Sequence, residues 1–289
     1  FIVAPLDQYD IFTKEDFSEE QNMYAQTAKE FAINRIKPVN DQLKGLNKDL
    51  SLQLFKEAGL PDGVINFVPG KGSMVGPNII KDSNLAGIHF TGSTSVFQSM
   101  WKDIGDNIDN YKTYPRIVGE TGGKDFILAH KSSNREGLQT AMIRGAFEYQ
   151  GQKCSAASRC YIPTNIWEDT KEILLSEMST IKMGDVEDFT NFVNAVIDEP
   201  AFDSISSYIN YSKESPDAEI IHGGSYDKTK GYFIEPTVIV TKNPKFKTMV
   251  EEIFGPVMTI YIYDADKWKS AISLDSVSYT HLTLPTNRE

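Results

Sequence analysis

The chain has 289 residues, of which 40% are hydrophobic and 24% are charged, and its formal net charge at pH 7 is −11. This length suits one large domain or two ordinary ones, and the composition is typical of a soluble globular protein. The acidic balance argues against a nucleic-acid partner, which favours a basic face, and no apolar run approaches the roughly 20 residues of a membrane span.

The first 57 residues are predicted to be helical. Residues 18–21, Ser-Glu-Glu-Gln, form a capping-box pattern, and apolar side chains then recur with helical spacing as far as Phe31. Pro38 is expected to end that helix, and residues 43–58 predict a second helix with one apolar stripe. The segment offers no chemical motif, and we interpret it as a pair of packing helices.

From Gly59 onward the pattern changes to strands that alternate with helices. Residues 64–68 predict a short buried strand between a turn at 60–63 and a glycine-rich exit at 69–72. A helix is expected over 78–84, and a second strand over 86–90.

The second strand runs directly into Thr91-Gly92-Ser93-Thr94, where Ser93 or Thr94 can cap the next helix. A strand, a Gly-Ser turn and a helix present backbone N–H groups to a phosphate, although many α/β proteins turn this way without a ligand. The helix is expected to bury one face, which carries Phe97, Met100, Trp101, Ile104 and Ile108.

The remaining elements continue the alternation and predict an α/β layered fold with parallel strands. An amphipathic helix over 136–149 leads to Cys154. The other expected strands cover 116–119, 126–129, 219–221 and 257–263, an extended segment covers 236–240, and the other helices cover 167–181 and 202–211.

Cys154 is the candidate nucleophile. It follows the flexible Gly151, lies beside Lys153, and stands where a helical pattern gives way to small polar residues. A nearby positive charge or a helix N-terminus favours the thiolate, and a glycine turn gives a substrate access. The alternative interpretation is a small buried hydrophobic residue.

Glu120 is the candidate general base. It lies at the exit of a short apolar run, before Thr121-Gly122-Gly123-Lys124. Glu120 and Cys154 together are interpreted as a base and its nucleophile. Taken alone, Glu120 could equally be a solvated loop carboxylate.

No metal site or disulfide framework is expected. The chain has two cysteines, Cys154 and Cys160, which fits a reducing compartment. Its four histidines are isolated and have no metal-ligand spacing.

Four motifs together resemble the aldehyde dehydrogenase superfamily, over roughly residues 54–274. They occur in the order and at the spacing found in that family: Phe90-Thr91-Gly92-Ser93-Thr94, Glu120-Thr121-Gly122-Gly123-Lys124, Gly151-Gln152-Lys153-Cys154 and Glu251-Glu252-Ile253-Phe254-Gly255-Pro256. Residues 111–116 and 151–159 are most similar to the branch that oxidises L-glutamate γ-semialdehyde to glutamate with NAD in proline breakdown.

The resemblance implies a partial Rossmann-type nucleotide-binding domain over 58–118 and an α/β catalytic domain over 119–276, preceded by the helical segment 1–57. It implies that Cys154 is the nucleophile, Glu120 the deacylation base, and Ser155 a holder of the carboxylate end of the substrate. The implied NAD-binding residues are Gly92, Ser93, Thr94, Ser95 and Val96 along the pyrophosphate, Glu252 at the nicotinamide ribose and Phe254 against the nicotinamide. Alone, Glu252 and Ser155 could be helix-capping groups and Phe254 a core residue.

The sequence also departs from the family pattern. The Pro-Trp-Asn type motif that supplies the oxyanion-hole Asn, the Lys-Pro-Ser segment at the adenosine ribose, the C-terminal substrate-anchoring loop and the oligomerisation strands are not found. Residues 11–21 and the helix that follows instead resemble the N-terminal helical segment of bacterial acyl-CoA dehydrogenases, with an apparent junction near 55–59. We therefore expect a chimera of two reading frames, with a foreign, unstructured tail over 277–289.

Three hypotheses for function remain open at this stage. The first is an NAD-dependent dehydrogenase of glutamate γ-semialdehyde, impaired by the missing groups. The second is an acyl-CoA dehydrogenase-like flavoprotein fragment, and the third is a non-catalytic α/β fragment. The first implies a small aldehyde substrate, a homo-oligomer for the intact family member, and a location in the bacterial cytoplasm or the eukaryotic mitochondrial matrix.

Overall fold

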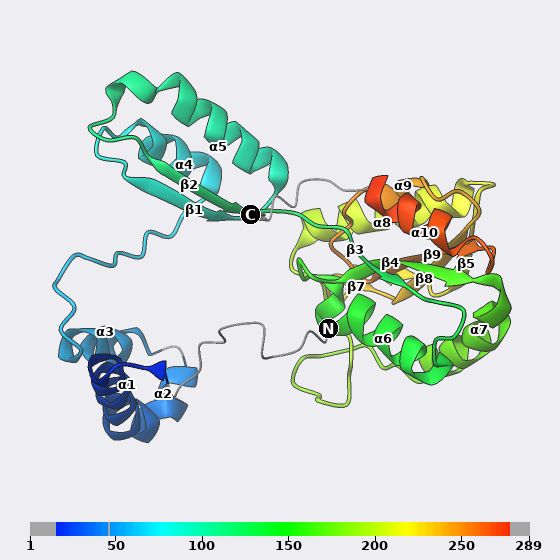
Figure 1. Cartoon of the computed structure of the whole chain (residues 1–289), viewed down its shortest axis with the longest axis horizontal. Helices are drawn as coiled ribbons and strands as arrows, with labels where there is room; N and C mark the ends of the chain where they lie inside the picture. Colours follow the sequence, from blue (N-terminus) through cyan, green and yellow to red (C-terminus); the bar gives the residue numbers. More distant parts are fainter. Residues whose placement is uncertain (1–15, 46, 278–289) are drawn as a thin grey trace. The chain divides into compact units, whose positions relative to one another are not determined.

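The computed structural model describes residues 16–45 and 47–277, with side chains as far as Ser273. It divides into two compact units, residues 1–75 and residues 76–289, which are described in turn. The expected foreign tail lies outside the described residues except for Val277, which ends the last helix (Figure 1).

The first unit is a run of short helices. They are α1 (Glu19–Phe31), a π-helical turn η3 (Ala32–Ile36), a 3₁₀ turn η4 (Lys37–Val39), α2 (Asn40–Lys44) and α3 (Lys48–Glu57). The predicted capping box is confirmed, since the Ser18 side chain accepts from the backbone of Gln21 and the Gln21 side chain accepts from the backbone of Ser18.

Pro38 does not end the helical path, contrary to the prediction. It occupies one of the first positions of η4, where a missing N–H costs no intrahelical hydrogen bond. The break comes later, at Gly45, which caps α2, so the expected helix over 43–58 is divided between α2 and α3.

The strand predicted over 64–68 is wrong. The segment is irregular, and its apolar side chains are exposed, with Phe67 at 77%. A strand needs a neighbour for its backbone hydrogen bonds, and no strand among the described residues pairs with this segment. The next helix, α4 (Gly72–Lys81), begins earlier than the predicted 78–84.

The second unit opens with a strand–helix–strand segment that contains the predicted phosphate-type turn. β1 (Gly87–Thr91) pairs in parallel with β2 (Arg116–Glu120), and α5 (Thr94–Asp106) and the 3₁₀ turn η5 (Ile108–Asn110) connect them. The expected apolar face of α5 is only partly buried, since Ile104 is 2% exposed and Trp101 is 58% exposed.

A five-stranded sheet forms the centre of the rest of the unit, in the order β3-β4-β9-β8-β5. Its strands are β3 (Asp125–Leu128), β4 (Ala157–Pro163), β5 (Ala218–His222), β8 (Thr237–Thr241) and β9 (Val257–Tyr263). Neighbouring strands are parallel except β5 and β8. The prediction of parallel strands is thus wrong for β5. The link from β5 to β8 holds only a small hairpin, β6 (Tyr226–Asp227) and β7 (Phe233–Ile234), and lacks the crossover helix that parallel pairing requires.

Helices cover both faces of this sheet (Figure 1). On one face, α6 (Arg135–Phe147) and α7 (Thr164–Met178) pack on β4 and β9 around a core that includes Met142, Leu174 and Ile260, each fully buried. On the other face lie α8 (Glu199–Glu214), α9 (Lys247–Val250) and α10 (Trp268–Val277). The predicted α/β layered fold is confirmed.

Candidate functional site

A left-handed turn delivers the chain from α6 to Cys154. The 3₁₀ turn η6 (Glu148–Gly151) holds Tyr149, Gln150 and Gly151 at φ values of 58°, 57° and 65°. Gly151 is required here, because a Cβ would lie 2.8 Å from the Ala146 carbonyl oxygen and closer still to that of Gly255. The predicted helix therefore stops at Phe147, two residues early, and Tyr149 is exposed.

Cys154 itself is exposed in the turn that precedes β4. Two arguments for its activation do not hold. It does not lie at a helix N-terminus, and the ammonium of Lys153 forms an ion pair with Glu148 at 2.7 Å. That contact lowers the pKa of the Glu148 carboxyl. What this turn provides for Cys154 is therefore access to solvent.

Glu120 is the last residue of β2, beside the last residue of β1. Thr91 and Glu120 are partners in the parallel ladder, and the Gly92 N–H donates to the Glu120 carbonyl oxygen at 3.1 Å. The carboxyl ends of parallel strands meet at one edge, so the turn that contains Ser93 and the segment that begins at Glu120 start from the same place.

The loop between α9 and β9 carries Glu252 and Phe254. The Glu252 carboxylate accepts a hydrogen bond from the Gly123 N–H at 3.0 Å and occupies the space where Gly122 would carry a Cβ. Phe254 has a left-handed backbone, with φ of 54°. Two distant segments, at 122–123 and 252–254, are thus joined by a contact that only glycine at 122 permits.

These segments enclose a cavity of about 290 Å³. Its walls contain six of the ten predicted site residues, Gly92, Ser93, Glu120, Cys154, Glu252 and Phe254, together with Thr91, Thr121 and Gly122. The other four do not line it. Thr94, Ser95 and Val96 form the first turn of α5, and Ser155 is an exposed neighbour of Cys154.

The lining fits a dinucleotide. Ser93 caps α5 by accepting from the Val96 N–H at 3.4 Å, so the positive end of a 13-residue helix starts at the wall of the cavity. The opposite wall offers the carboxylate of Glu252, a suitable acceptor for ribose hydroxyls, and the ring of Phe254, a flat surface for a heteroaromatic ring.

Lys124, which was not among the predicted site residues, directly follows the glycines that contact Glu252. Its side chain is 7% exposed, and its Nζ has no hydrogen-bond partner among the described residues. Burial first, and then the charge of Arg159, lower the pKa of Lys124 to about 7, against the opposing effect of Glu252 and Glu251. In the sequence, the charged pair Lys124-Asp125 directly before an apolar strand is the pattern that could have indicated a buried lysine.

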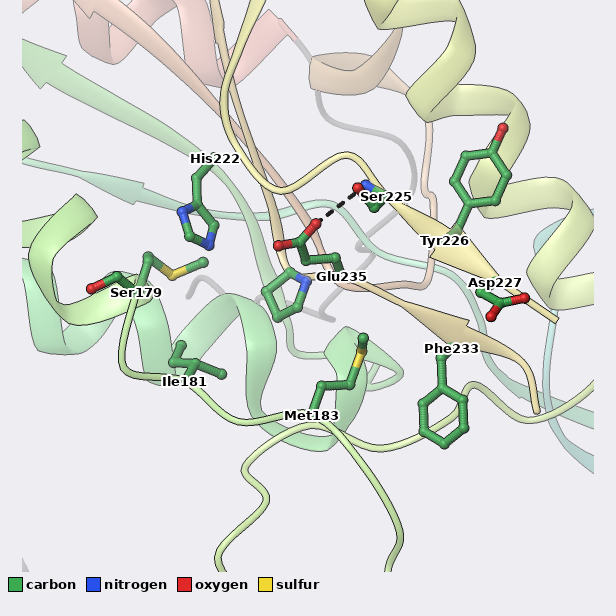
Figure 2. Close-up of a pocket in the computed structure, with 11 residues that line it drawn as sticks. Ser179, Ile181, Met183, His222, Ser225, Tyr226, Asp227, Phe233 and Glu235 are labelled. Carbon is green, nitrogen blue, oxygen red and sulfur yellow. Dashed lines mark hydrogen bonds between the residues drawn. The ribbon is translucent and has the colours of Figure 1, made fainter. Parts of the chain in front are cut away.

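A second cavity, of about 300 Å³, contains none of the predicted residues. Figure 2 shows His222 and Glu235 in its wall among apolar side chains such as Met183 and Phe233, with the Ser225 N–H donating to Glu235 at 3.4 Å. It offers neither a thiol nor a helix N-terminus, so the cavity with Cys154 is the candidate active site.

No group of three or more His, Cys, Asp or Glu side chains among the described residues is arranged to hold a metal ion. None of the helices in the described part of the chain has the length and apolar character needed to cross a membrane.

Comparison with known proteins gives a consistent match. The model of the aldehyde dehydrogenase family matches residues 43–274. A mitochondrial delta-1-pyrroline-5-carboxylate dehydrogenase of Dictyostelium discoideum is 52% identical over 220 residues, which are 75% of this chain and 39% of that protein. The mitochondrial human enzyme of the same name is 43% identical over 233 residues, 80% of this chain and 41% of that protein.

The solved structures give the same result. The delta-pyrroline-5-carboxylate dehydrogenase of Mycobacterium tuberculosis, crystallised with NAD, superposes with a TM-score of 0.72 at 43% identity, covering 78% of this chain and 41% of that one. The chain therefore spans about two fifths of the length of these relatives.

Proposed function

Because the chain belongs to the aldehyde dehydrogenase family, we propose that it carries the nucleophile, the base and part of the NAD site of an L-glutamate γ-semialdehyde dehydrogenase. Such an enzyme oxidises the open-chain form of 1-pyrroline-5-carboxylate to glutamate in proline breakdown. The observation that carries the proposal is that Cys154, Glu120, Ser93, Glu252 and Phe254 line one cavity.

The chemistry follows from the residues. The Cys154 thiolate adds to the aldehyde carbon and forms a C–S bond, which gives a thiohemiacetal. Its oxyanion collapses to a thioester as the hydride leaves, and NAD, when bound, supplies the acceptor for that hydride. Glu120 takes a proton from a water molecule, which attacks the thioester, releases the carboxylic acid and restores the thiol.

The binding roles divide between the two sides of the cavity. We assign Gly92, Ser93, Thr94, Ser95 and Val96 to the pyrophosphate, since they form the turn and the first helical turn of α5, and backbone N–H groups at a helix N-terminus bind anions. Glu252 holds the nicotinamide ribose, and Phe254 packs against the nicotinamide. Ser155, exposed beside Cys154, is assigned to the carboxylate end of the substrate.

The proposed domains follow these roles. Residues 1–57 form the helical segment, 58–118 part of the nucleotide-binding domain and 119–276 the catalytic domain. For the whole enzyme we propose a homo-oligomer, located in the mitochondrial matrix of a eukaryote, as the names of the Dictyostelium and human relatives support, or in the cytoplasm of a bacterium.

A chimeric origin stays a proposal that rests on the acyl-CoA dehydrogenase-like residues 11–21. The family match begins at residue 43, so α3 belongs to the aldehyde dehydrogenase part and we expect any junction to lie before it. An uninterrupted read of the gene across codons 11 to 75 tests this, and one continuous genomic frame over that stretch would rule the chimera out.

The function is tested by following NADH absorbance at 340 nm with glutamate γ-semialdehyde. We expect turnover by the wild-type chain and a loss of at least about a thousandfold in Cys154→Ala, because the variant has no nucleophile. Glu120→Gln should still release NADH in the first turnover and then stall at the thioester. Equal rates in the wild type and Cys154→Ala would remove Cys154 from the mechanism, and bound flavin absorbance would favour the acyl-CoA dehydrogenase alternative.

A further inference from the structure

We propose that Tyr208 on α8 is a positioning residue for the loop of residues 251–256, which holds Glu252 and Phe254 in the cavity wall. The inference deepens the proposed function and rests on it for the identity of the ligand. The Tyr208 hydroxyl donates a hydrogen bond to the Glu251 carboxylate at 2.7 Å, and Glu251 directly precedes Glu252 in the chain.

The loop needs an external support because it has little regular structure of its own. It lies between α9 and β9, and Phe254 has a left-handed backbone. Its backbone is fixed at both ends, since the Glu251 N–H donates to the Lys247 carbonyl and the Pro256 carbonyl accepts from the Thr237 N–H, both at 2.9 Å. Between these points, side-chain contacts decide where Glu252 and Phe254 lie.

One turn of α8 supplies three of those contacts. Ile253 is 5% exposed and packs in a cluster with Ile205 and Ile209. Gly255 lies so close to Ile205 that a Cβ would collide with it. Tyr208 adds a directional contact through Glu251, since a hydrogen bond to a charged acceptor is stronger than one between neutral groups and fixes the geometry of its partners.

The Tyr208 hydroxyl is suited to remain a donor. Burial first, and then its contact with Glu251, raise the pKa of Tyr208 to about 12, so the hydroxyl keeps its proton at every physiological pH. The ammonium of Lys247 lies 4.9 Å from the centre of the Tyr208 ring, in a cation–π contact with the same side chain.

Tyr211 provides a matched control on the same helix. The Lys247 ammonium lies 5.3 Å from its ring, but within the described residues its hydroxyl makes no hydrogen bond. Tyr208→Phe and Tyr211→Phe therefore remove the same atom from two tyrosines that share the Lys247 contact, and only the first removal frees Glu251.

The test measures amide hydrogen exchange over residues 251–255, together with the dissociation constant for NAD, in the wild type, Tyr208→Phe and Tyr211→Phe. We expect about tenfold faster exchange and about fivefold to tenfold weaker NAD binding in Tyr208→Phe alone. Glu251→Gln, which keeps an acceptor oxygen, should retain most of the wild-type protection, whereas Glu251→Ala should match Tyr208→Phe.

The outcomes separate this inference from the proposed function. Unchanged exchange in Tyr208→Phe, or an equal change in Tyr211→Phe, would overturn the positioning role whether or not NAD binds. Faster exchange with unaltered NAD affinity would overturn the link to the cofactor. A wild-type chain that does not bind NAD would count against the proposed function, while the exchange data would still decide the role of Tyr208.

Discussion

At the scale of the residue, the two cysteines differ in environment more than in sequence context. Cys154 is exposed in a turn, and Cys160 is completely buried in β4, with its thiol 3.4 Å from the sulfur of Met258. Burial raises the pKa of Cys160 to about 12, which suppresses its thiolate at neutral pH. The same residue type is thus a nucleophile candidate at one position and a core residue at the other.

We predict that iodoacetamide at pH 8 alkylates Cys154 in the native chain and leaves Cys160 unmodified. Peptide mass spectrometry after a timed reaction checks this, and Cys154→Ala should take up no label until urea is added. Alkylation of Cys160 at a rate similar to that of Cys154 in the folded chain would contradict the structure.

Lys124 predicts a pH dependence of stability. Its pKa falls from 10.5 in the unfolded chain to about 7 in the folded one. Between these values the unfolded state binds more protons, so the free energy of unfolding rises with pH, by at most about 1.4 kcal/mol per pH unit. Below pH 7 both states are protonated, and the cost of burying the ammonium is fully present.

We expect Lys124→Met to be more stable than the wild type at pH 6, by about 1–3 kcal/mol, with the difference shrinking as pH rises from 7 to 10. Urea unfolding at several pH values measures it. Lys102→Met, which changes an exposed lysine on α5, is the control and should show no such trend. A constant difference between Lys124→Met and the wild type would mean that Lys124 does not titrate in this window.

At the scale of the element, the η6 turn brings the segment that carries Cys154 against the loop that carries Phe254. Gly151 has a positive φ, and its Cα faces the carbonyl oxygens of Ala146 and Gly255. The turn that precedes Cys154 and the loop that carries Phe254 can approach this closely only because residue 151 has no side chain.

We predict that Gly151→Ala destabilises the chain by about 2–4 kcal/mol and slows turnover, since the added Cβ separates these two segments. Gly105→Ala is the matched control. Gly105 lies near the end of α5, where a Cβ would meet no atom within 4 Å, so alanine should be neutral or slightly stabilising. Thermal unfolding of both variants checks the contrast, and similar melting temperatures would contradict it.

At the scale of the whole molecule, the irregular segment after α3 is the site where we expect proteolysis. Residues 60–71 form no helix or strand, and the side chains of Val64 and Phe67 are exposed. Brief digestion with proteinase K should cut first between 60 and 71 and leave a stable product that begins near Gly72. N-terminal sequencing of the product decides the point, and a first cut within α6 or β4 would contradict the fold.

The sequence alone predicted most helices and strands and six of the residues that line the candidate site. Periodicity located α1 and α6–α8, the Gly-Ser turn at 92–93 predicted the cap of α5, and four motifs in order indicated the family that the match over 43–274 shows. These features could be read because each depends on local spacing or on a short chemical pattern.

Only the tertiary structure decided the features that depend on a distant partner. The segment 64–68 has strand-like residues but no neighbouring strand, and β5 is antiparallel because its link to β8 has no crossover helix. Lys153 is paired with Glu148, Lys124 is buried without a partner among the described residues, and Tyr208 meets Glu251 from 43 positions away. A local pattern specifies what a segment can form, but burial and hydrogen bonding across the chain decide which charges, edges and hydroxyls find partners.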